Sequence, residues 1–173
     1  MEANYPKMKT PGAPQSTVHA ALTEDEAGAL KTHPVLEAAL GYWMQKQGGG
    51  GMPLCEDVDI LDLPLEILPW VIFTEVLRDP LDFRYTYMGA SIVQMCRRDL
   101  TGCRLSALPQ TGRNSVLWAQ RAALVAARRP TFAVPPYTGP DVSVRKVRNI
   151  HMPLTRTGTE VDVIFTAVAF EQM

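Results

Sequence analysis

The chain lacks the features that mark secreted and membrane proteins. Its 173 residues contain three cysteines, an odd number without a dense pattern, together with eight methionines. This composition favours a reducing compartment. No apolar run follows Lys7 and Lys9 as in a signal peptide, and no later run approaches the roughly 20 apolar residues of a membrane span. We therefore expect a cytoplasmic protein with no membrane partner.

An excess of one charge is also absent. The chain has 17 basic and 18 acidic residues and a formal net charge of -1, which provides no long-range field for nucleic acid. The basic cluster VRKVR, residues 144–148, has two interpretations: a nucleic-acid contact, or charges that keep a sheet edge from pairing with other chains. We favour the second interpretation and expect no nucleic-acid partner.

The common catalytic and phosphate-binding motifs are missing as well. The sequence has no G-x-S-x-G elbow, and the four glycines at 48–51 lack the Lys-Ser/Thr pair that grips phosphate. Asp57, Asp59 and Asp62 suggest a calcium loop, but Leu61 stands where such a loop needs a further oxygen ligand. We expect these carboxylates to cap a helical turn instead, and we expect no enzymatic activity.

A metal site is weakly indicated. Cys96, Cys103 and His151 lack the short paired spacing of four-ligand zinc sites. Thiols with apolar neighbours are usually packed in the interior, so we favour packing over metal binding. The sequence thus predicts no metal and leaves any other cofactor unknown.

The chain divides into three parts. Residues 1–22 are rich in Pro, Gly, Ser and Thr and predict a disordered tail. Residues 23–51 predict a helical arm, in which Thr23 to Glu26 match a capping box and the segment from Pro34 to Gln47 is amphipathic before the glycine-rich joint. Residues 52–173 form the main domain.

The main domain reads as two strands, a block of helices and three strands. One or two helical turns are expected at 90–97, a short turn at 104–109, and a helix at 114–129 with Asn114 as its N-cap. Strands are expected at 70–77, 82–88, 131–137, 142–154 and 159–170. Pro135 and Pro136 confine the third strand to an edge or end it early. This order predicts an α+β fold: a five-stranded antiparallel sheet with helices packed on one face.

Four stretches, DFRYTYMG, RRDLTG, RRPTF and HMPLTRTGTEVDVIFTAVAF, carry a resemblance along residues 34–170. In this pattern the chain resembles the PAS-like family of short, single-domain bacterial proteins. The resemblance implies a PAS fold and a non-catalytic role as a sensory or protein-interaction module in signalling. It also implies that the aromatic strand and the Asp99–Gly102 turn frame a cleft that can bind a small ligand.

Four residues are the candidate ligand contacts. On the helix at 114–129, Arg121 lies in an apolar stripe beside Trp118. Arg121 either covers the edge of this stripe with its stem or reaches into the cleft toward an anion or a buried carboxylate, and we favour the first. Tyr87 is placed by strict alternation with Phe83 and Tyr85 on the inner face. His151 either hydrogen-bonds a neighbour, faces the cleft or binds haem iron, and we favour the first.

Two functional hypotheses follow. The first is a regulatory module that binds a protein partner or a second copy of itself, with or without a small molecule in its cleft. Its arm exposes Leu36, Leu40, Trp43 and Met44 for a homodimer, or covers its own sheet with them. The alternative is a small enzyme or carrier acting on an organic acid, with Arg121 as anchor and His151 as base.

Overall fold

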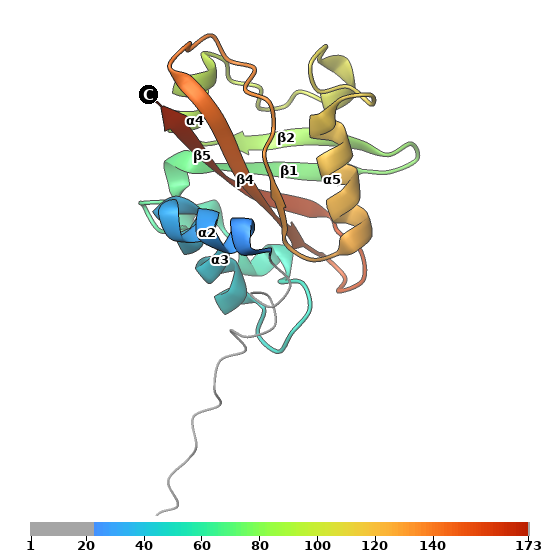
Figure 1. The fold of residues 1–173 in the computed structure, drawn as a ribbon. Helices are drawn as coiled ribbons and strands as arrows, with labels where there is room; N and C mark the ends of the chain where they lie inside the picture. The colour runs from blue at the N-terminus through green and yellow to red at the C-terminus, as the bar shows by residue number, and fades with distance from the viewer. Residues whose placement is uncertain (1–22, 173) are drawn as a thin grey trace, which may run out of the picture.

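The fold is built around one antiparallel sheet in a computed structural model that describes residues 23–172. The predicted tail at 1–22 lies outside the described residues. The strands are β1 (Val71–Leu77), β2 (Asp82–Met88), β3 (Thr131–Ala133), β4 (Val144–Leu154) and β5 (Val163–Gln172). They pair in the order β2-β1-β5-β4-β3, and every neighbouring pair is antiparallel (Figure 1). The predicted α+β class and five-stranded antiparallel sheet are confirmed.

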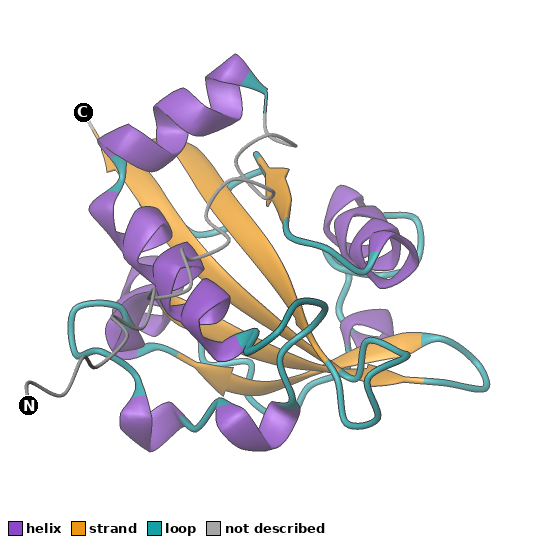
Figure 2. Cartoon of the chain, turned by 90° about the horizontal axis from the view of Figure 1, so that it is seen from below, coloured by secondary structure: helices purple, strands orange, loops and turns teal. Residues whose placement is uncertain are grey.

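Helices cover both faces of the sheet (Figure 2). The α-helices are α2 (Glu24–Thr32), α3 (Pro34–Lys46), α4 (Ala90–Cys96) and α5 (Val116–Ala127), and short 3-10 turns are η1 (Cys55–Asp57), η2 (Ile60–Asp62), η3 (Leu68–Trp70) and η4 (Leu105–Ala107). The block of α4, η4 and α5 covers one face, as expected for the main domain. Within residues 23–172, no helix combines the length and apolar character needed to cross a membrane.

The arm starts with the predicted capping box. The Thr23 hydroxyl accepts a hydrogen bond from the Glu26 amide at 3.3 Å, and the Glu26 carboxylate accepts one from the Thr23 amide at 2.7 Å. These two bonds satisfy backbone donors that have no partner inside the helix. The next helix, α3, begins at Pro34, whose ring fixes a helical φ where no amide hydrogen is needed.

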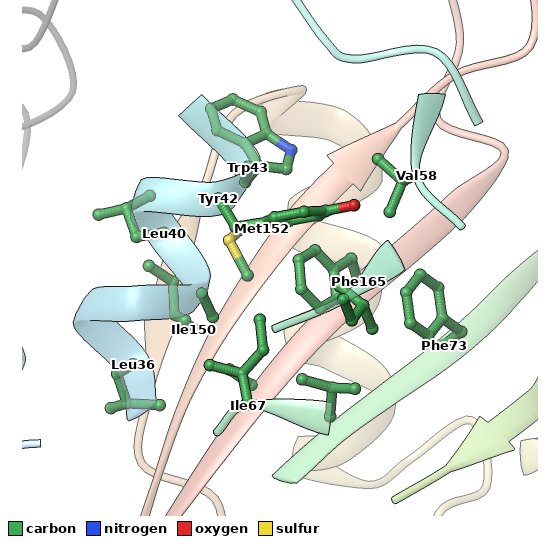
Figure 3. Packing of buried hydrophobic residues seen from close by; sticks show 14 of the residues in the cluster. Leu36, Leu40, Tyr42, Trp43, Val58, Ile67, Phe73, Ile150, Met152 and Phe165 are labelled. Carbon is green, nitrogen blue, oxygen red and sulfur yellow. The ribbon is translucent and has the colours of Figure 1, made fainter. Parts of the chain in front are cut away.

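The arm packs on the sheet of its own chain. Leu36, Leu40 and Trp43 on α3 are buried in a core that includes Met152 and Phe165 of the sheet (Figure 3). Trp43 is 1% exposed, and its indole nitrogen donates a hydrogen bond to the Pro153 carbonyl at 2.9 Å. Of the two arrangements open from the sequence, the chain therefore adopts the one in which the arm covers its own sheet.

The opposite face holds a second core under α5. Phe83, Ile92, Trp118 and Leu124 meet there with the side chains of β1 and β5. The α5 helix begins one residue later than expected: Ser115, and not Asn114, is the N-cap, and its hydroxyl accepts from the Trp118 amide at 3.1 Å. Both residue types are good caps, so the sequence preference alone does not separate two adjacent positions.

A β-bulge changes which way the end of β2 faces. Thr74 pairs with Tyr85 but Phe73 pairs with Tyr87, so Thr86 is the extra residue. Such an insertion reverses the alternation beyond it. Phe83 and Tyr85 face α5, whereas Tyr87 packs on Phe73 on the arm side. The prediction that Tyr87 shares a face with Phe83 and Tyr85 is wrong for this reason.

The third strand ends early, as its prolines predict. β3 stops at Ala133, lies at the sheet edge and pairs only with β4 among the described strands. Pro135 and Pro136 have no amide hydrogen to continue the ladder. The chain from there to β4 is free to cross the mouth of the α5 face.

Gly89 is required by a close backbone approach, and its replacement is a test of the packing of η3 against α4. A Cβ atom at Gly89 would lie 2.3 Å from the Pro69 carbonyl oxygen, which belongs to the backbone. We expect Gly89→Ala to lower the free energy of unfolding by about 1–3 kcal/mol, as overpacking does. Gly41→Ala is the control, because a Cβ there meets nothing within 4 Å. Equal urea midpoints for Gly89→Ala and wild type would contradict this packing.

Candidate ligand-binding site

A cavity of about 270 Å³ lies between α5 and the sheet. Its floor includes Ile72 and Val168 of the sheet, and α5 contributes Leu117 and Arg121. The other walls come from the turn after α4, residues 108–111 between η4 and α5, and the β3–β4 loop. The lining is largely apolar, with a few polar groups. This composition is typical of small-molecule sites.

Arg121 is the buried charged residue in the lining of this cavity. It is 2% exposed, its Nη1 donates to the Leu117 carbonyl at 3.0 Å, and its guanidinium lies 5.5 Å from the centre of the Tyr85 ring. Its Nε has no hydrogen-bond partner. None of the ion pairs formed within residues 23–172 includes Arg121. The cavity thus contains a buried positive charge that the described part of the chain does not neutralise.

The charge of the lining has one sign. Arg98, exposed at the rim, is the second arginine of the cavity, and neither aspartate nor glutamate is among the lining side chains of the described chain. Arg98 also forms no ion pair with another described residue. A cavity of this charge repels cations and attracts anions.

Two polar side chains of β4 lie on the same side of the sheet. Asn149 lines the cavity, and its Oδ1 is buried without a partner. Two residues on, His151 is fully buried, with Nδ1 2.8 Å from the Thr166 hydroxyl and Nε2 unpartnered. Burial, and secondarily the charge of Arg121, lower the pKa of His151 to about 3. His151 is therefore neutral at physiological pH, and it lies outside the cavity lining.

Several buried polar atoms on the α5 face of the sheet have no hydrogen-bond partner. Thr74 Oγ1, Arg121 Nε, Asn149 Oδ1 and His151 Nε2 are all buried without partners. Each such atom costs about 1–3 kcal/mol when nothing compensates it. On the arm face of the described chain the corresponding atom is the Tyr42 hydroxyl. The α5 face therefore has more buried polar atoms without hydrogen-bond partners than the arm face.

Two local networks hold the cavity walls. Asp82 accepts from the Ser106 hydroxyl at 2.5 Å, which ties η4 to β2. Burial acts to raise the pKa of Asp82, but hydrogen bonds from Ser106 and from the Phe83 amide outweigh it and hold the pKa below its ordinary value. On the other wall, the Tyr137 hydroxyl donates to the Met95 carbonyl at 2.8 Å and joins the β3–β4 loop to α4.

The Asp99–Gly102 turn is structural. Asp99 Oδ1 accepts from the Thr101 amide at 2.9 Å, and the Gly102 amide donates to the Tyr85 carbonyl at 2.7 Å. Gly102 has φ +86°, a conformation that glycine adopts without strain. The turn thereby lies along the edge of β2 and carries Leu100 into the cavity wall.

The four predicted contact residues separate in the structure. Arg121 lines the cavity. Trp118 packs edge-on against Phe83, with ring centres 4.9 Å apart, and His151 lies in the sheet beside the cavity lining. Tyr87 is on the opposite face, where its hydroxyl donates to the Leu68 carbonyl at 3.4 Å. Sequence reasoning missed Tyr85 and Asn149, although alternation from Phe83 and from Val147 places both on the α5 face.

The metal hypotheses find no supporting geometry in the described part of the chain. No group of three His, Cys, Asp or Glu side chains within residues 23–172 is placed to hold a metal ion. Asp59 caps η2, with Oδ1 accepting from the Leu61 amide at 2.9 Å, as expected for a helical turn.

In the basic cluster at residues 144–148, Arg148 forms an ion pair with Glu171.

No protein-family model matches the chain, and no curated protein matches it.

Proposed function

We propose that the chain is a PAS-like, non-catalytic sensory module of the bacterial cytoplasm, and that its signal is a small molecule held in the α5 cavity. The observation that carries this proposal is the buried, uncompensated Arg121 in a cavity of about 270 Å³. The element order of two strands, helices and three strands supports it, because the sequence resemblance rests on the same order.

The cavity is placed to pass on a signal. Its lining combines α5, the turn after α4 and the β3–β4 loop, which are separate segments of the surface. A ligand that contacts all three would favour one arrangement of them over others. A protein partner, or a second copy of the chain, that contacts this surface would then distinguish the loaded from the empty state.

The enzyme or carrier alternative has less support. It needs His151 as a base at the ligand, but His151 lies outside the cavity lining and has a pKa of about 3. A general base works best with a pKa near the operating pH. Arg121 serves a binding protein equally well as an anchor.

Native mass spectrometry of the protein purified from its own cells tests the proposal. We expect an added mass that disappears under denaturing conditions. Leu117→Trp, which fills the cavity from α5, should lose the added mass, whereas Val116→Trp, at a neighbouring position that is 55% exposed, should retain it. A bare mass in wild type, or an adduct equally present in both variants, would contradict a cavity ligand.

A further inference from the structure

We infer that the cavity takes a monocarboxylate with an apolar body about the size of an aromatic ring, and that the ligand carboxylate binds the guanidinium of Arg121. This inference rests on the proposed function, since it names the chemical class of the ligand at the same site.

The negative charge of the ligand is inferred from the unpaired guanidinium of Arg121. Nη1 of Arg121 is used by the Leu117 carbonyl, whereas Nε is buried without a partner and no ion pair of the described residues includes this side chain. A buried charge is stable only when it is paired. Carboxylate is the partner that fits an arginine edge best, because two parallel N–H···O bonds form at once. A neutral ligand would leave the charge uncompensated.

The apolar body of the ligand is inferred from the other side chains that line the cavity. Ile72, Met88, Leu100, Val147 and Val168 surround the space next to Arg121. A strongly hydrated inorganic anion would lose its water against these side chains without replacing those hydrogen bonds. An organic acid instead buries its hydrocarbon part there.

The size follows from the volume. The cavity holds about 270 Å³, and an apolar cavity of about 150 Å³ accepts benzene. In proportion, this cavity suits a ligand of roughly ten non-hydrogen atoms. Phenylacetate has this size and class and is the probe of choice.

Calorimetric titration of the full chain, after removal of any bound compound by unfolding and refolding, tests the inference with three probes. Phenylacetate should bind. Phenylacetamide keeps the shape without the charge, and acetate keeps the charge without the body. We expect each of these two to bind roughly tenfold to a hundredfold more weakly than phenylacetate, the range for loss of a charge-assisted bond or of a buried ring.

Two arginine variants locate the carboxylate. Arg121→Met should remove the preference for phenylacetate over phenylacetamide, while its thermal unfolding shows that the protein still folds. Arg113→Met is the matched control, because Arg113 is exposed and lies over the Trp118 ring outside the cavity lining. It should leave the preference unchanged.

The outcomes separate this inference from the proposed function. Equal binding of acid and amide, a preference that survives Arg121→Met, or no phenylacetate binding at all would overturn the ligand class. The proposed function depends on the native mass measurement, in which an adduct of another class would keep a cavity ligand and exclude only the carboxylate.

Discussion

Replacing Trp43 with alanine is expected to lower the free energy of unfolding by about 3–5 kcal/mol, the range for removing a fully buried tryptophan. Trp43 is 1% exposed in the core between α3 and the sheet, and it also donates a hydrogen bond to the Pro153 carbonyl. The variant would leave a cavity under the arm and a carbonyl without its donor. Urea denaturation of the full chain measures the change.

Two controls separate the contributions at this position. Trp43→Phe keeps most of the ring volume and removes the indole donor, so it should cost about 1–3 kcal/mol. Leu61→Ala alters a side chain that is 89% exposed and should change stability by less than about 0.5 kcal/mol. A loss below about 1 kcal/mol in Trp43→Ala would mean that the arm does not rest on its own sheet in solution.

Acid pH is expected to lower the stability of the folded protein through His151. The pKa of His151 is about 3 in the folded chain because burial and the Arg121 charge disfavour the imidazolium, whereas an unfolded histidine has a pKa of about 6.5. Below pH 6.5 the unfolded state therefore binds the proton and the folded state does not, so stability falls as the pH falls from about 6.5 toward 3. By linkage this group alone removes up to about 3 kcal/mol between pH 7 and pH 4.

His151→Gln isolates this contribution. Its urea-unfolding free energy should fall less steeply than that of wild type between pH 7 and pH 4, since the variant has no imidazole to protonate there. Arg121→Met should also fall less steeply, because removal of the neighbouring positive charge allows the pKa of His151 to rise toward its ordinary value. Parallel pH profiles for wild type and His151→Gln would show that His151 is solvated in the folded protein.

Much of the fold follows from local sequence signals. The capping box at Thr23, the alternation of β2 and the prolines after Ala133 each specify an element through its own backbone chemistry. The place of the arm does not follow in this way. An amphipathic helix buries the same stripe against its own sheet or against another chain, and only the tertiary structure selects between them.

The positions of the candidate site residues could be predicted where the periodicity of a helix or strand is regular. Helical spacing placed Arg121 in the apolar stripe of α5, and the structure puts it in the cavity. Tyr87 failed because one extra residue, Thr86, reverses the faces of β2 beyond Tyr85. A bulge has little local sequence signature, so strict alternation is the natural reading of residues 82–88 until the partner strand is known.

The burial of the Arg121 side chain could not be predicted from the sequence. From the sequence, a stem at the stripe edge was the commoner arrangement, with the guanidinium in water. The structure instead buries the whole side chain, with Nε unpartnered. The turn after α4 and the β3–β4 loop line the same cavity as Arg121. Their positions depend on contacts distant in sequence, such as the hydrogen bond from Tyr137 to Met95.

The central claim is that the guanidinium of Arg121 binds the carboxylate of the ligand. Proton–nitrogen correlation spectra of the arginine side chains, with the Arg121 signal assigned by its absence in Arg121→Met, observe this group directly during a phenylacetate titration. We predict that the Arg121 Nε–H signal shifts with phenylacetate and shifts far less with phenylacetamide. An unchanged Arg121 signal at phenylacetate concentrations that saturate binding elsewhere on the protein would contradict the account.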